Sequence, residues 1–171
     1  MTNRQLDMEN IDRVDNLVYT PLEKRYLKAR IAGTVLAYAG LMVLPLFILL
    51  AEDLKGRWTI IACAESLLAL TALINLMLIP KACAFMGFAL REHDITWRTG
   101  IIFPSVTTIP FCKIQQVSIR QNPVSRLFGL YSVHIVNGAQ MMADTVIPGL
   151  AREKADEVKE LLIERAKYES R

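Results

Sequence analysis

The feature that most constrains this chain is a run of 21 residues, 31–51, that contains no charged side chain. As an α-helix rising about 1.5 Å per residue, this run reaches roughly 31 Å, which matches the hydrocarbon core of a bilayer. A second apolar run of similar length, 58–79, follows a short polar turn and carries one formal charge, Glu65. The two runs predict a transmembrane hairpin over residues 31–80.

The hairpin divides the chain into an N-terminal arm, residues 1–30, and a C-terminal segment, residues 81–171. Only the second is long enough to bury a hydrophobic core of its own. Four basic residues, Lys24, Arg25, Lys28 and Arg30, precede the first span, whereas the turn carries two, Lys55 and Arg57. The positive-inside rule therefore predicts a multi-pass protein of the inner or plasma membrane with both termini in the cytoplasm.

Two patterns within the spans concern helix packing. Small residues recur at helical spacing in each span: Gly33, Ala37 and Gly40 in the first, and Ala62, Ser66 and Ala69 in the second. Such stripes allow close approach of helices in lipid, so we expect the two helices to pack on each other. Pro45 is expected to bend the first helix because its ring removes one backbone hydrogen bond.

After Pro80 the apolar period changes from helical to about two, which indicates strands. We expect a strand pair within 82–99 and further strands at 101–103, 106–109, 114–120, 131–135 and 141–147. Asn122-Pro123 predicts a turn or short helix through Phe128, ended by Gly129 with a positive φ. Residues 150–168 have the pattern of an amphipathic helix. The fold class is therefore an α+β membrane protein: a helical hairpin followed by an antiparallel β-barrel or sandwich that a C-terminal helix closes.

The sequence carries no signature of an enzyme or of a nucleic-acid-binding protein. GxSxG, P-loop, GxGxxG and HExxH motifs are absent, and the three cysteines show neither CxxC nor Cys/His ligand spacing. A net charge of +3 is too small for a nucleic-acid footprint. We therefore predict no catalytic residue, cofactor site, metal site or nucleic-acid partner.

Two sets of residues are candidates for binding. Lys113, Arg120 and Arg126 are predicted to form a basic strand face that binds anionic inner-leaflet lipids or an acidic partner, and a merely solvated face is the alternative. Glu65 and Asn75 are candidates for polar contacts inside the membrane, because a carboxylate facing lipid is costly. The alternative for Glu65 is a role in a transport accessory subunit.

The C-terminal segment also resembles a known family. The pattern IP(x)₂KIQ(x)V over 109–117, the Gln-Asn-Pro turn at 121–123 followed by Arg126 and Phe-Gly-Leu at 128–130, and the closing helix are similar to the bacterial pleckstrin-homology-like (PH-like), membrane-flanked domain of the YdbS-like proteins. The resemblance covers about residues 80–165 and includes the preceding hairpin. Lys113 departs from the Arg that we expect there, which keeps the charge but alters any bidentate contact.

The resemblance implies a PH-like domain in a prokaryotic integral membrane protein, and no catalytic residues. It implies a membrane complex with a larger protein that carries repeats of the same domain, and a role in envelope stress protection. A homo-oligomer is the alternative assembly. The expected function is thus a non-enzymatic interaction module displayed at the membrane, and a sensor of anionic lipid is the runner-up.

Overall fold

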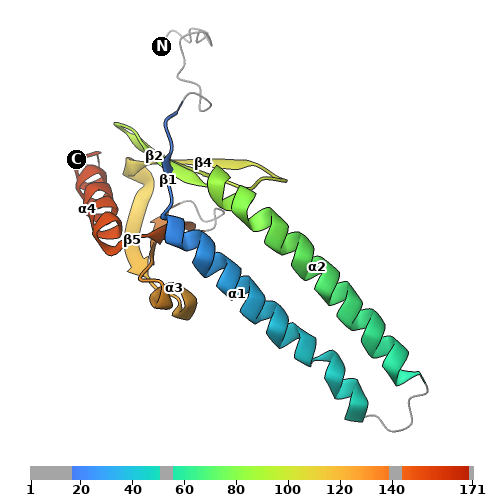
Figure 1. The fold of residues 1–171 in the computed structure, drawn as a ribbon. Coiled ribbons are helices and arrows are strands. Elements are labelled where there is room, and N and C mark those ends of the chain that lie inside the picture. The colour runs from blue at the N-terminus through green and yellow to red at the C-terminus, as the bar shows by residue number, and fades with distance from the viewer. Residues whose placement is uncertain (1–16, 51–55, 139–143, 170–171) are drawn as a thin grey trace.

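The computed structural model describes residues 17–50, 56–138 and 144–169, in which two long helices lead into two antiparallel sheets and a final helix (Figure 1). The helices are α1 (Lys24–Val43), α2 (Arg57–Phe85), α3 (Pro123–Leu127) and α4 (Arg152–Glu169), with 3-10 segments η3 (Pro45–Leu50) and η4 (Phe111–Lys113). The strands are β1 (Thr20–Pro21), β2 (Gly87–Leu90), β3 (Asp94–Thr99), β4 (Ser105–Pro110), β5 (Ile114–Arg120), β6 (Tyr131–Asn137) and β7 (Thr145–Leu150).

The helices α1 and α2 run side by side and project away from the sheets (Figure 1). Both are long and apolar enough to cross a membrane. Large apolar side chains such as Leu36, Leu67 and Met77 are exposed along them, as expected where lipid takes the place of water. The predicted hairpin is therefore present, and its turn at 51–55 lies outside the described residues.

The two prolines act differently from the predictions. Pro45 does not bend a continuous α-helix: α1 ends at Val43 and the chain continues as the 3-10 segment η3. Pro80 lies inside α2, which continues to Phe85, so the strand predicted from residue 82 begins only at Gly87. Good helix formers, Lys and Ala, follow Pro80, and they continue the helix despite the lost backbone hydrogen bond.

The strands form a four-stranded sheet, β1-β2-β3-β4, and a three-stranded sheet, β5-β6-β7, both antiparallel. The predicted strand 114–120 matches β5, and α3 ends before Gly129, whose φ is +63°. Residues 101–103 are not the predicted strand but an exposed bend between β3 and β4, entered through Gly100 with φ +81°. The start of the strand predicted at 141–147 lies outside the described residues.

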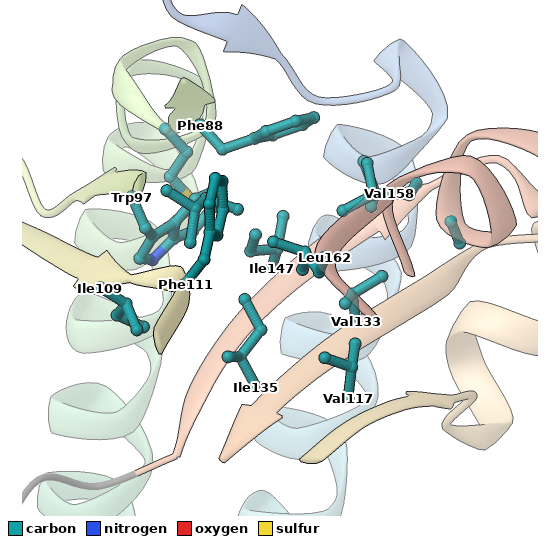
Figure 2. Close-up of a cluster of buried hydrophobic side chains, with 14 residues drawn as sticks. Phe88, Trp97, Ile109, Phe111, Val117, Val133, Ile135, Ile147, Val158 and Leu162 are labelled. Atoms are coloured by element: carbon teal, nitrogen blue, oxygen red, sulfur yellow. The ribbon is translucent and has the colours of Figure 1, made fainter. Parts of the chain in front are cut away.

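The hydrophobic core lies between the two sheets and under α4. Figure 2 shows side chains from both sheets and from α4 pointing toward one another. Its fully buried members include Phe88 and Ile95 of the first sheet, Val133, Ile135 and Ile147 of the second, and Val158 and Leu162 of α4. The C-terminal helix therefore covers the core, as the sequence predicts.

The N-terminal arm contributes to this fold. The described end of the arm joins the first sheet: Thr20 and Pro21 pair with Phe88 and Gly87 of β2, and Leu22 packs against the core. An edge position tolerates Pro21, whose missing N–H costs no ladder bond toward solvent. Residues 1–16 lie outside the described residues.

Candidate functional site

The junction between the hairpin and the sheets is short and built from several contacts. Only Met86 separates α2 from β2. The Arg98 Nε donates to the Phe85 carbonyl oxygen at 3.0 Å, and its guanidinium lies 4.4 Å from the Phe85 ring centroid and 4.2 Å from that of Tyr19. Arg98 thus satisfies a terminal helix carbonyl and joins α2, β3 and the N-terminal arm.

On the other side, α1 is fixed against β7 and α3. The Glu23 amide donates to the Gly149 carbonyl oxygen at 3.1 Å, and a Cβ on Gly149 would lie 2.7 Å from Cβ of Tyr26. A Cβ on Gly33 would lie 3.8 Å from Val124 of α3. The first turns of α1 therefore belong to the folded domain as well as to the hairpin.

A cavity of about 460 Å³, which we call the Arg30 cavity, lies between α1, α2 and α3. Its lining from α1 consists of two adjacent ridges at i, i+4, i+8 spacing. One ridge consists of small residues, Ala29, Gly33 and Ala37, and the other of polar residues, Arg30, Thr34 and Tyr38. Tyr26 also lines the cavity from α1. The opposite walls are formed by Asn75 of α2 and by Asn122, Val124 and Ser125 of α3 and its N-cap. The cavity is thus a groove along α1 with a small floor and a polar wall.

Arg30 is the charged group of this cavity. Its Nη1 donates to Met86 Sδ at 3.4 Å, and its guanidinium interacts with the side chains of Tyr26 and Cys83. Among the residues that the structure describes, Arg30 forms no ion pair with a carboxylate. Because thioether and thiol sulfurs are weak hydrogen-bond acceptors, most of the five N–H donors of Arg30 lack a strong acceptor among the described residues of the cavity.

A second, more apolar cavity of about 300 Å³ lies on the other side of Arg30 and Asn75. It is lined by α2 residues near Ile79 and by the exposed bend at 101–103. Phe103 lines this cavity and is at the same time 85% exposed. The bend therefore lies beside the last turns of α2, where the second apolar run ends.

The structure places the two predicted intramembrane residues in different surroundings. Asn75 Nδ2 donates to Tyr38 Oη at 2.6 Å and so links α2 to α1. Glu65 is half-buried, and its Oε1 is buried without a hydrogen-bond partner in the part of the chain that the structure describes. A functional role for either residue stays a proposal.

The three basic residues of the predicted strand face are all exposed. Lys113 precedes β5 and Arg120 ends it, so the length of the strand, roughly 20 Å at 3.3 Å per residue, separates them. Arg126 lies in α3, near the end of β5 that carries Arg120. Lipid or partner binding by these three residues stays a proposal.

His134 lies on the outer face of the β5-β6-β7 sheet, opposite Ser118. Partial burial lowers the pKa of His134, and the charge of Arg120 lowers it further, while Asp144 acts in the opposite direction. The imidazole therefore stays neutral at pH values where an exposed histidine begins to protonate. No group of three or more metal-ligating side chains occurs within residues 17–50, 56–138 and 144–169.

The small-residue stripes do not lie between the two helices. The helices pack together, but Gly33 faces Val124, and a Cβ on Gly40 would meet nothing within 4 Å. On α2, Ala62, Ser66 and Ala69 are all exposed. The prediction that these stripes form the α1–α2 interface is therefore wrong for these residues, because spacing alone does not determine which face of a helix meets its neighbour.

Sequence reasoning missed the Arg30 cavity. It treated Arg30 only as one of four residues that set orientation, and it gave Tyr38 no role. The available signal was a polar ridge, Arg30, Thr34 and Tyr38, continuing at i, i+4, i+8 into an otherwise apolar span. Nothing local indicated that α3, almost a hundred residues further on, would form the opposite wall.

The comparisons with known proteins agree with this architecture. The family model described as Bacterial PH domain matches residues 31–166, which cover most of α1, all of α2, the strands β2 to β7 and most of α4. The transmembrane protein YdbS of Bacillus subtilis (strain 168) is 26% identical over 92 residues, which cover 53% of this chain and 56% of YdbS. The chain thus matches about half the length of that relative. No solved structure is significantly similar to this chain.

The expected PH-like domain after a pair of apolar helices is confirmed by the family match and by the observed sheets and closing helix. The match extends over most of the chain and includes both apolar helices. The chain is a YdbS-like membrane protein and belongs to the bacterial PH domain family.

Proposed function

We propose that this protein is a non-enzymatic module that displays its PH-like domain on the cytoplasmic side of the inner or plasma membrane. There it assembles with a second membrane protein of the same family. The partner is a larger chain with repeated PH-like domains, and the physiological role is protection of the envelope under stress. In this arrangement the hairpin binds the partner within the bilayer and the domain is presented at its surface.

The rigid junction supports the role of a displayed module. Because Met86 alone separates α2 from β2, and Arg98 holds the end of α2 to β3, the domain is held in one orientation relative to the helices. A fixed orientation lowers the entropy cost of binding a partner that is itself anchored in the same membrane.

The observation that carries the proposal is the exposed stripe of Ala62, Ser66 and Ala69 on α2. The Ser66 hydroxyl donates to the Ala62 carbonyl oxygen at 2.6 Å, so the stripe presents little polarity and no bulk. Such a surface lets a second helix approach closely, where dispersion and weak polar contacts drive association. The stripe on α2 is directed away from α1 and is therefore available to a partner helix.

The assembly is tested by purifying the full-length protein from its own membranes in mild detergent and identifying co-purifying proteins by mass spectrometry. We expect a stoichiometric membrane protein of the same family. Ser66→Leu should abolish its recovery, whereas Leu67→Phe, which adds bulk at an exposed position on another face of α2, should leave it unchanged. Recovery of the chain alone, or equal recovery with both variants, would contradict the proposal.

The cytoplasmic location is tested with Cys112, which is exposed on the domain. A membrane-impermeant maleimide should label Cys112 in inside-out vesicles and not in intact spheroplasts, with Cys112→Ser as the control. Labelling in intact spheroplasts would place the domain outside the cell and refute this part of the proposal.

A further inference from the structure

The Arg30 cavity carries an inference that is independent of the proposed partner. Arg30 is the last charged residue before the uncharged run 31–51, so its guanidinium lies where the apolar span begins. Its described partners, Met86, Tyr26 and Cys83, are neutral, and two of them are sulfur groups. A half-buried guanidinium without a carboxylate gains most from a phosphate, which accepts two parallel N–H bonds.

The shape of the cavity indicates what this phosphate is attached to. From Arg30 to Tyr38 the groove follows α1 for eight residues, about 12 Å toward the centre of the predicted span. Its floor there consists of Gly33 and Ala37, which leave room for a chain of methylene groups. A small soluble anion would fill only the end near Arg30.

Polar groups are placed at both levels of the groove. Asn122 and Ser125 line it from α3 and its N-cap, opposite α1. Deeper in the groove, Tyr38 Oη accepts from Asn75, so its own hydroxyl proton is available to a ligand oxygen. A headgroup near Arg30 and an ester oxygen further along the groove match these donors.

We propose that the Arg30 cavity binds an anionic membrane phospholipid. Its phosphate pairs with Arg30 near Asn122, and one acyl chain lies along Gly33 and Ala37. The lipid thereby fills the space between the hairpin and α3. The site differs from the face formed by Lys113, Arg120 and Arg126, none of which lines the cavity.

The test uses the full-length protein in nanodiscs that contain phosphatidylcholine and phosphatidylglycerol, followed by gentle extraction into detergent and mass spectrometry of the retained lipid. We expect phosphatidylglycerol to be retained selectively. Arg30→Gln should lower its affinity by about tenfold or more, because a charge-assisted contact is lost. Lys28→Gln removes the same charge from the same part of α1 but outside the cavity, and it should retain the lipid.

A second variant keeps the test valid if Arg30→Gln fails to fold. Ala37→Leu fills the floor of the groove and leaves Arg30 unchanged, so it should also release the lipid, with fluorescence of the buried Trp97 as the control for folding. Equal retention of the two lipids would overturn the proposal, as would retention by both Arg30→Gln and Ala37→Leu. Displacement of the lipid by millimolar inorganic phosphate would overturn it too, because the site would then recognise the phosphate alone.

Discussion

Gly149 is the position where one added methyl group should separate α1 from the domain. Its φ is +70°, and a Cβ there would lie 2.6 Å from Cδ2 and 2.7 Å from Cβ of Tyr26. An alanine in the left-handed region costs about 1–2 kcal/mol. Forcing a methyl group into a filled space costs about 1–3 kcal/mol more. Gly149→Ala should therefore lower the free energy of unfolding by about 2–5 kcal/mol, a large fraction of the stability of a typical domain.

The assay is equilibrium unfolding of the detergent-solubilised protein, followed by tryptophan fluorescence. The chain has two tryptophans: Trp97 is buried in the core and Trp58 is exposed at the start of α2. A Trp58→Phe background therefore leaves a signal that reports only on the domain. The shift in the denaturant midpoint, at constant m-value, gives the change in stability.

A double-mutant cycle with Tyr26→Ala separates the two contributions. Tyr26→Ala removes the overlap with the ring but leaves the contact with Cβ of residue 26 at 2.7 Å, so Gly149→Ala should then cost less than in the presence of Tyr26, though still at least the backbone term of about 1–2 kcal/mol. An equal cost in both backgrounds would show that the ring does not restrict the Gly149 site. If Gly149→Ala costs less than about 1 kcal/mol in the chain that keeps Tyr26, the argument that alanine is strained at a positive φ is refuted as well.

Three further predictions concern the domain. Burial and, to a smaller extent, the charge of Arg120 lower the pKa of His134, so protonation of His134 opposes folding and the free energy of unfolding should fall as the pH drops below about 6.5. Arg120→Gln should raise the pKa of His134 in an NMR titration. An unchanged titration would contradict the effect of the Arg120 charge on His134. Leu162→Ala, in the core, should cost about 2–5 kcal/mol in chemical unfolding, whereas Ile163→Ala on the exposed face of α4 should cost far less, and equal costs would contradict the packing. Asn122→Ala removes the side-chain cap of α3 and should cost about 1 kcal/mol, with faster hydrogen exchange of the α3 amides; unchanged exchange would show that the cap is unimportant.

Much of the fold follows from local patterns. β5 has the predicted bounds 114–120, and α3 ends before Gly129, because strand alternation and a positive-φ glycine act within a few residues. The end of α2 was predicted wrongly at Pro80, since the sequence does not show that Arg98 hydrogen-bonds the carbonyl of Phe85. Local signals therefore determined most elements but not where each one stops.

The candidate site was much less predictable. Asn75 was recognised as a polar residue in a span, but its partner Tyr38 was not, because the pair depends on how far one helix slides along the other. Arg30 was recognised only as a charge. The basic residues of the strand region suggested a single face formed by Lys113, Arg120 and Arg126. In the structure, Lys113 and Arg120 lie at opposite ends of β5.

The sequence alone is enough to indicate that this chain enters a membrane, because two long apolar runs, with Glu65 as their one formal charge, cannot be accommodated by a domain of this size in water. It also determined the alternation of short strands and the amphipathic closing helix, which are periodic and therefore local. The folded structure was needed to show that the N-terminal arm joins the first sheet, that the stripe on α2 faces outward, and that Gly33 meets Val124. These contacts join residues far apart in the chain, and they depend on which faces pack best together rather than on any pattern within one segment.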